Sequence, residues 1–170
     1  MQSVMSTATP EKIHELLEDF ESAMLVTSGE SSSPFHARPM EVAHLDKDCR
    51  VWFFTSLKSP KVGEIRQDEN VLLTFQKDHR KYLTLTGKAD IVTDRTRIEA
   101  LWKESYRSWF PDGVADPDLA LVKVIPERAE FWDNSGSKGI RYLYEAAKAR
   151  MQGTTPHIEE GEVHGVVALT

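Results

Sequence analysis

The stretch from Val51 to Ile65 decides the fold of this chain: Val-Trp-Phe-Phe-Thr-Ser-Leu-Lys-Ser-Pro-Lys-Val-Gly-Glu-Ile. Its first five residues are mostly aromatic or β-branched, which predicts a strand. Ser59 and Pro60 are typical of a helix start, because serine caps a helix and proline suits its first position. The sequence therefore predicts a strand that turns directly into a helix.

The turn between this strand and helix carries two hydroxyls and two lysines, namely Thr55, Ser56, Lys58 and Lys61. Free backbone N–H groups and the positive end of a helix dipole meet at such a turn, which favours a bound anion such as phosphate. The glycines of a P-loop are absent, so the same residues also fit a strand–turn–helix with solvated lysines.

The composition is that of an ordinary soluble domain, with 170 residues, 40% hydrophobic and 28% charged. The net charge of −6 argues against nucleic-acid binding, which needs a basic face. No apolar run is long enough to span a membrane, and the first residues do not form a signal peptide. The single cysteine, Cys49, cannot form an internal disulfide. We therefore expect a cytoplasmic protein that binds neither nucleic acid nor membrane.

About seven strands and up to four helices are predicted. Apolar periodicity and caps place helices at 10–21, 59–67, 94–105 and 137–151. Strands are expected at 23–28, 35–43, 50–55, 70–76, 81–92, 121–126 and 128–133. The first three strands should form an antiparallel meander, and the last two a hairpin or one strand split by a bulge at Pro126. Gly87 indicates a kink of the kind that a small barrel needs in order to curve.

This order of elements predicts a mainly β fold with peripheral helices, in which the strands form a closed or partly open antiparallel barrel rather than a parallel sheet. One domain is expected over residues 1–152, including the N-terminal and C-terminal helices. The apolar stripe of the last helix consists of Ile140, Leu143, Tyr144 and Ala147. Residues 153–170 show no clear period, so we expect a loose tail there.

The second predicted strand contains Ala37-Arg38-Pro39-Met40. Proline removes a ladder hydrogen bond and belongs at an edge or bulge, where strands often meet ligands. An exposed arginine on an edge strand would explain the motif, but a ligand lying across this strand and the phosphate-like turn explains it better. Zinc, Rossmann and nucleophile-elbow motifs are absent, and no metal site is predicted.

Three motifs together resemble the FMN-binding split-barrel family related to pyridoxamine 5′-phosphate oxidase, and most of all its general-stress-protein 26 branch. They are Ala37-Arg38-Pro39-Met40, the run from Trp52 to Lys61, and the run from Pro126 to Asp133. The resemblance covers residues from about 10 to 150. It implies an antiparallel split β-barrel that forms a homodimer, with FMN at the subunit interface.

The resemblance also implies which residues line the flavin. Arg38, Pro39 and Met40 would lie along it, with Arg38 near the phosphate side and the backbone around Met40 facing the ring. Trp132 would pack near the flavin from the partner subunit. Aromatic side chains there would give the ring system a dry, polarisable wall.

The phosphate end of FMN is expected on the strand–turn–helix. By resemblance, Phe54 and Thr55 would contact the ribityl phosphate, and Lys61 would pair with the phosphate. Ser59 is a further phosphate donor. A lysine at a helix start adds a formal charge to the helix dipole, which suits a doubly charged group.

Three departures separate the chain from the oxidases that make pyridoxal phosphate. Pro60 stands where those oxidases have an arginine before the phosphate lysine, so one bidentate phosphate partner is missing. Tyr82 stands where they have a flavin-contacting glutamine. The tail after Gln152 does not match their C-terminal substrate-binding segment. The resemblance is therefore to the stress-protein branch, whose substrate it does not fix.

Three functions remain open. The first is a flavin oxidoreductase, in which FMN would undergo hydride transfer. The second is a flavin-binding protein without turnover, acting as a buffer or sensor. The third is a split barrel for another cofactor, such as haem or a deazaflavin, with His36 and His44 as the candidate axial ligands. The sequence identifies no catalytic acid or base, so enzymatic activity is left undecided.

Overall fold

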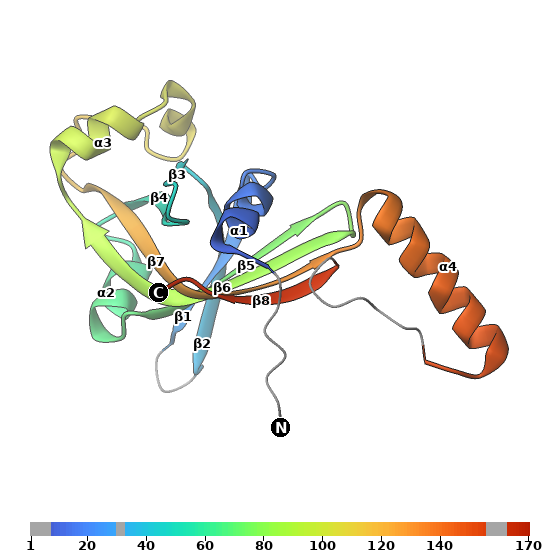
Figure 1. The fold of residues 1–170 in the computed structure, drawn as a ribbon. Coiled ribbons are helices and arrows are strands. Elements are labelled where there is room, and N and C mark those ends of the chain that lie inside the picture. The colour runs from blue at the N-terminus through green and yellow to red at the C-terminus, as the bar shows by residue number, and fades with distance from the viewer. Residues whose placement is uncertain (1–7, 30–32, 156–162) are drawn as a thin grey trace.

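The computed structural model describes residues 8–29, 33–155 and 163–170, with only the backbone at 137–142 (Figure 1). The described helices are α1 (Pro10–Leu17), α2 (Pro60–Gln67), α3 (Arg95–Leu101) and α4 (Gly136–Gln152), with a 3₁₀-helix at Glu104–Ser108. The strands are β1 (Ser22–Ser28), β2 (Phe35–Glu41), β3 (His44–Leu45), β4 (Val51–Ser56), β5 (Asn70–Lys77), β6 (Lys81–Val92), β7 (Leu119–Asp133) and β8 (His164–Ala168). No described helix is both long enough and apolar enough to cross a membrane.

The strands form one antiparallel sheet in the order β2-β1-β5-β6-β7-β4-β3, with β8 also paired to β7. The sheet curls into a half-barrel (Figure 1), so the edge strand β2 comes close to β4 without pairing with it. This arrangement confirms the split barrel with peripheral helices, and it leaves the proline strand at an edge, as expected.

The predicted meander of the first three long strands is wrong. β1 pairs with β2, but β4 pairs with β7 along its full length, from Val51 opposite Val124 to Ser56 opposite Leu119. The first five residues of β4 are buried on both faces, so the strand belongs inside the sheet. β2 contains Pro39, which cannot donate a ladder hydrogen bond, and this favours an edge position.

β7 is one continuous strand of 15 residues, so the alternative of a hairpin is wrong and the alternative of a bulge is confirmed. Thr86 pairs with Arg128 and Gly87 pairs with Pro126, which leaves Glu127 as the extra residue. A Cβ atom on Gly87 would lie 2.1 Å from the carbonyl oxygen of Ile125. Only glycine permits this close approach of two backbones.

The expectation of a loose tail is wrong for residues 164–168, whereas residues 156–162 lie outside the described part. β8 pairs with β7 from Ala168 opposite Arg128 to His164 opposite Trp132, and Val167 is buried in the core. A strand of five residues is too short for a clear period, and its pairing partner lies far away in the sequence. Sequence patterning therefore gave no signal for it.

Two apolar clusters lie on opposite faces of β4. Phe53 belongs to the main core, together with Ile13, Leu16 and Leu17 of α1. The second cluster consists of Trp52, Phe54, Ile98, Tyr106, Leu119 and Leu121. Because neighbouring strand residues point to opposite faces, Thr55 lies on the face of Phe53 and not on that of Phe54. The predicted helix at 94–105 is divided between α3 and the 3₁₀-helix.

Candidate functional site

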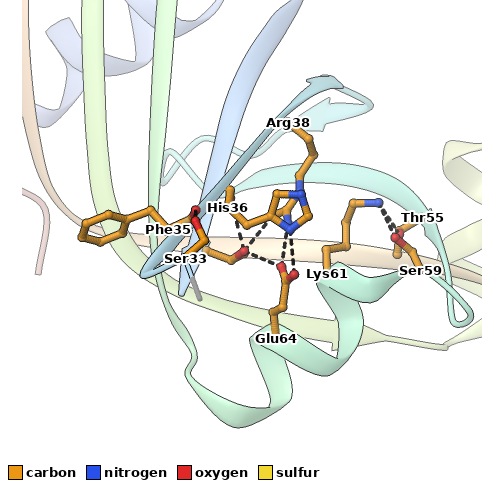
Figure 2. A network of polar contacts seen from close by, with 9 residues as sticks. Ser33, Phe35, His36, Arg38, Thr55, Ser59, Lys61 and Glu64 are labelled. Carbon is orange, nitrogen blue, oxygen red and sulfur yellow. Dashed lines mark hydrogen bonds and ion pairs between the residues drawn. The ribbon is translucent and has the colours of Figure 1, made fainter. Parts of the chain in front are cut away.

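A group of polar side chains lies where β2 and β4 approach each other across the open side of the barrel (Figure 2). On β1 and β2, the register pairs Thr27 with His36 and Leu25 with Arg38. Residues opposite each other in a sheet share a face, so His36 and Arg38 point to the same inner face as the buried Leu25. Thr27 is itself only 1% exposed.

Lys61, in the first turn of α2, is held by two hydroxyls. Its Nζ atom lies 2.7 Å from Ser59 Oγ and 3.4 Å from Thr55 Oγ1 (Figure 2). Thr55 is 2% exposed, and the Ser59 side chain makes no helix-capping hydrogen bond. Lysine has only donors, so both hydroxyls accept from it. The three side chains form a small polar cradle at the start of the helix, whereas Lys58 of the same turn is exposed and pairs with Asp118.

Burial lowers the pKa of the Lys61 ammonium, and the nearby Arg38 guanidinium lowers it further. Within the described residues, this ammonium makes no ion pair with a carboxylate, although Glu64 lies one turn along the same helix. Removing a cation from water without a paired anion is unfavourable. A bound anion would offset both the unfavourable free energy of burying the Lys61 ammonium and its repulsion by Arg38.

Glu64 of α2 lies beside this cradle and accepts hydrogen bonds from side chains of β1 and β2. Arg38 Nη2 and Thr27 Oγ1 each donate to Glu64 Oε2 at 2.6 Å, and His36 Nδ1 lies 2.7 Å from Glu64 Oε1. Arg38 Nη1 also donates to Thr27 Oγ1 at 2.7 Å. Burial alone would raise the pKa of Glu64, but the contacts with Thr27, His36 and Arg38 lower it to about 2. Glu64 is therefore ionised at neutral pH and fixes the direction of the arginine.

Four of the predicted site residues come together here, namely Arg38, Thr55, Ser59 and Lys61. Pro39 and Met40 follow Arg38 in the sequence, and their environments differ from each other. Met40 is buried in the main core, whereas Pro39 is exposed and pairs with Met24 on the outer face of the sheet.

The structure does not bring the Phe54 side chain to the cradle. Its ring lies in the second cluster, with centroids 4.9 Å from Tyr106 and 5.6 Å from Trp102. Phe54 and Thr55 therefore point to opposite faces of β4, and a shared side-chain contact with one phosphate group does not fit this packing.

Trp132 lies away from the cradle of its own chain. β4 pairs with residues 119–124 of β7, whereas Trp132 is near the opposite end of that strand. Its ring stacks on His164 with centroids 5.2 Å apart, and the residue is 36% exposed. The expectation that Trp132 contacts flavin across a subunit interface stays a prediction.

The sequence patterns do not point to Glu64 or Thr27, and they indicate His36 only as a haem ligand. A local signal existed for Glu64, because residues three apart on a helix share a face and Lys61 precedes it by three. The contact between Thr27 and Glu64 joins residues 37 apart in sequence, which no local pattern reveals. The other candidate haem ligand, His44, has its Nε2 atom 3.1 Å from Asp46 Oδ1.

The family model described as pyridoxamine 5′-phosphate oxidase like matches residues 8–157. The chain belongs to this family. That membership confirms the resemblance carried by the three sequence motifs, and the match includes every residue of the polar group.

Solved structures support the same assignment. A protein from Jannaschia sp. CCS1 assigned as general stress protein 26 is 28% identical, with a TM-score of 0.68 over 91% of this chain and 94% of that chain. The general stress FMN/FAD binding protein from Xanthomonas citri is also 28% identical, with a TM-score of 0.64 over 75% of this chain and 90% of that chain.

One curated relative, Protein bli-3 from Neurospora crassa, is 24% identical over 138 residues. The match covers 72% of this chain but 66% of the relative, so the chain spans slightly less than two thirds of that protein's length.

Proposed function

We propose that this protein binds FMN through its terminal phosphate, at the cradle formed by Lys61, Ser59 and Thr55. The observation that carries the proposal is the partly buried Lys61 ammonium, which is held by two hydroxyls and lacks an ion-paired carboxylate in the described part of the chain. The FMN/FAD binding described for the Xanthomonas citri structure supports a flavin as the ligand.

The chemistry of the cradle suits a terminal phosphate group. A phosphate monoester carries close to two negative charges at neutral pH, and its oxygens accept strong hydrogen bonds from an ammonium and from hydroxyl groups. The positive end of the α2 dipole lies at the same place and favours an anion. Riboflavin has the same ring system without the phosphate, so it should bind much more weakly.

We further propose that two copies form a homodimer and share each flavin site. Phe131 is completely buried, whereas its neighbour Trp132 and the cross-strand partner Tyr82 are 36% and 37% exposed on the outer face. Strand alternation prevents Phe131 and Trp132 from filling the same core. An exposed aromatic pair on the outer face of a sheet is well suited to contact a partner or an aromatic ligand.

The proposed activity is that of a flavin oxidoreductase with an undefined substrate. Bound FMN would supply the hydride chemistry, and the protein would supply binding, orientation and electrostatics. The polar group offers cations and hydroxyls suited to holding a phosphate, and we assign none of its side chains a role in proton transfer. A flavin-binding protein without turnover remains the alternative.

The visible spectrum of the purified protein tests this proposal. A bound flavin should give a yellow preparation with flavin absorption, and added FMN should restore any lost occupancy. Bleaching of the bound flavin by reduced nicotinamide would support an oxidoreductase. Bound flavin that resists this reductant would favour the non-catalytic alternative, and a protein that takes up no flavin would contradict the proposal.

A further inference from the structure

Helix α4 carries an apolar stripe that faces away from its own chain. Leu143, Tyr144 and Met151 are 64%, 66% and 89% exposed, and Ala147 is exposed as well. An α-helix turns by about 100° per residue, so these four positions share one side, whereas the buried Ala149 lies on the other. Figure 1 shows α4 projecting from the end of β7, away from the curled sheet and the other helices.

Such a helix needs a surface to pack against. Short isolated helices are marginally stable in water, and most helical stability in proteins comes from packing of an apolar face. Large exposed apolar side chains grouped on one surface mark an interaction site. The sequence predicted an apolar stripe at Ile140, Leu143, Tyr144 and Ala147, and in the single chain its members with described side chains, the last three, are exposed to solvent.

The charge of α4 indicates what covers the stripe. Its 17 residues, Gly-Ser-Lys-Gly-Ile-Arg-Tyr-Leu-Tyr-Glu-Ala-Ala-Lys-Ala-Arg-Met-Gln, include four cations and one carboxylate. The whole chain has 21 Lys and Arg residues against 27 Asp and Glu, so the rest of it has 17 cations against 26 carboxylates. A cationic helix is attracted to an acidic body and repelled by a second cationic helix.

We propose that α4 is an arm that docks, through this stripe, on the body of a second copy of the chain. In a two-fold dimer each copy gives one arm and receives one. A helix of 17 residues is about 25 Å long, so the two arms of a dimer would give two extended contacts. The inference rests on the proposed homodimer and adds the element that holds its two copies together.

Sedimentation velocity of the full-length chain over a range of concentrations tests the arm. Leu143→Glu and Met151→Glu place a carboxylate on the stripe, and Gln152→Glu places the same charge on another side of the helix. Each stripe variant should raise the dimer dissociation constant at least about ten-fold, because a charge would be buried at an apolar contact. The dimer dissociation constant of the control, Gln152→Glu, should stay within about two-fold of the wild-type value. Raising the salt concentration should weaken the wild-type dimer. Matching circular dichroism spectra would show that the stripe variants remain folded.

Stripe variants that dimerise as tightly as the wild type would overturn the proposal that α4 docks on a second copy. If Trp132→Ala still lowers FMN affinity in that case, the shared flavin site stands without the arm. A wild-type chain that is monomeric at all concentrations would overturn both. Binding of the wild type to phosphatidylglycerol vesicles, lost in Leu143→Glu without any change in the dimer, would assign the helix to an anionic membrane surface and would also overturn the arm.

Discussion

Arg38 donates to Glu64 at 2.6 Å, joining the edge strand β2 to helix α2 across the open side of the barrel. The two side chains are 14% and 13% exposed, so this ion pair is largely shielded from water. Glu64 balances one of the two neighbouring cations, Arg38, and leaves Lys61 as the cation that an anionic ligand can neutralise. The charge pattern of the candidate site therefore depends on a contact between distant parts of the chain.

Arg38→Ala should lower both FMN affinity and the stability of the apo-protein. Its removal leaves the Glu64 carboxylate without its arginine partner, and breaking a shielded ion pair from one side is destabilising, here by roughly 1–3 kcal/mol. Urea unfolding and FMN titration measure the two effects. The double variant Arg38→Ala, Glu64→Ala should recover part of the lost stability, because the unpaired carboxylate is gone. If the double variant instead loses as much stability as Arg38→Ala and Glu64→Ala lose together, the two residues act independently.

The stability of the protein should fall at acid pH because of Glu64. Its pKa is lowered from 4.5 to about 2 in the folded chain, so the folded state binds this proton less readily than the unfolded state. The stabilisation is complete above the unfolded pKa and is lost as the pH falls through the folded one. Between about pH 5 and pH 2, the melting temperature of the wild type should therefore fall more steeply with decreasing pH than that of Glu64→Gln. Parallel pH profiles for the two proteins would rule out this role for Glu64.

Gly87→Ala should strongly destabilise the fold. The added Cβ atom would meet the Ile125 carbonyl oxygen at 2.1 Å, and both atoms belong to paired backbones that cannot move apart cheaply. We expect a loss of about 2 kcal/mol or more in the free energy of unfolding. Gly63 in α2 is the matched control, because a Cβ atom there meets no atom within 4 Å. Gly63→Ala should instead stabilise the protein by roughly 0.5–1 kcal/mol.

Local patterns predicted the parts of this molecule that depend on neighbouring residues. The strand–turn–helix at residues 51–67 follows from spacing within one short segment, although the Ser59 side chain contacts Lys61 instead of capping the helix. The pairing of β4 with β7 and the joining of Thr27 to Glu64 depend on how the sheet curls, which the alternation of a single strand does not record. The resemblance of the motifs to a known family predicted the split barrel. The hydrogen-bond network around Glu64 could be seen only in the structure.

A mixed dimer tests whether two subunits share each flavin site. Lys61→Ala and Trp132→Ala should each weaken FMN binding when studied alone. In a mixed dimer, one site would combine the intact Lys61 of one subunit with the intact Trp132 of the other. Each mixed dimer should therefore bind FMN tightly at one of its two sites, which is about one site in four of an equimolar mixture in which subunits exchange freely. FMN titration of the mixture would show no restored sites if each flavin contacted a single subunit.

The central claim is that the Lys61 cradle holds the phosphate of FMN, and paired titrations with FMN and riboflavin test it most directly. Lys61→Ala removes a charge-assisted contact worth about 1.5–3 kcal/mol, so FMN affinity should fall roughly ten- to a hundred-fold while riboflavin affinity stays unchanged. Lys58→Ala is the control, because Lys58 is 80% exposed and pairs with Asp118. It should leave FMN binding within about two-fold of the wild type. Equal affinities of the wild type for FMN and riboflavin, or an unchanged FMN affinity in Lys61→Ala, would contradict the claim.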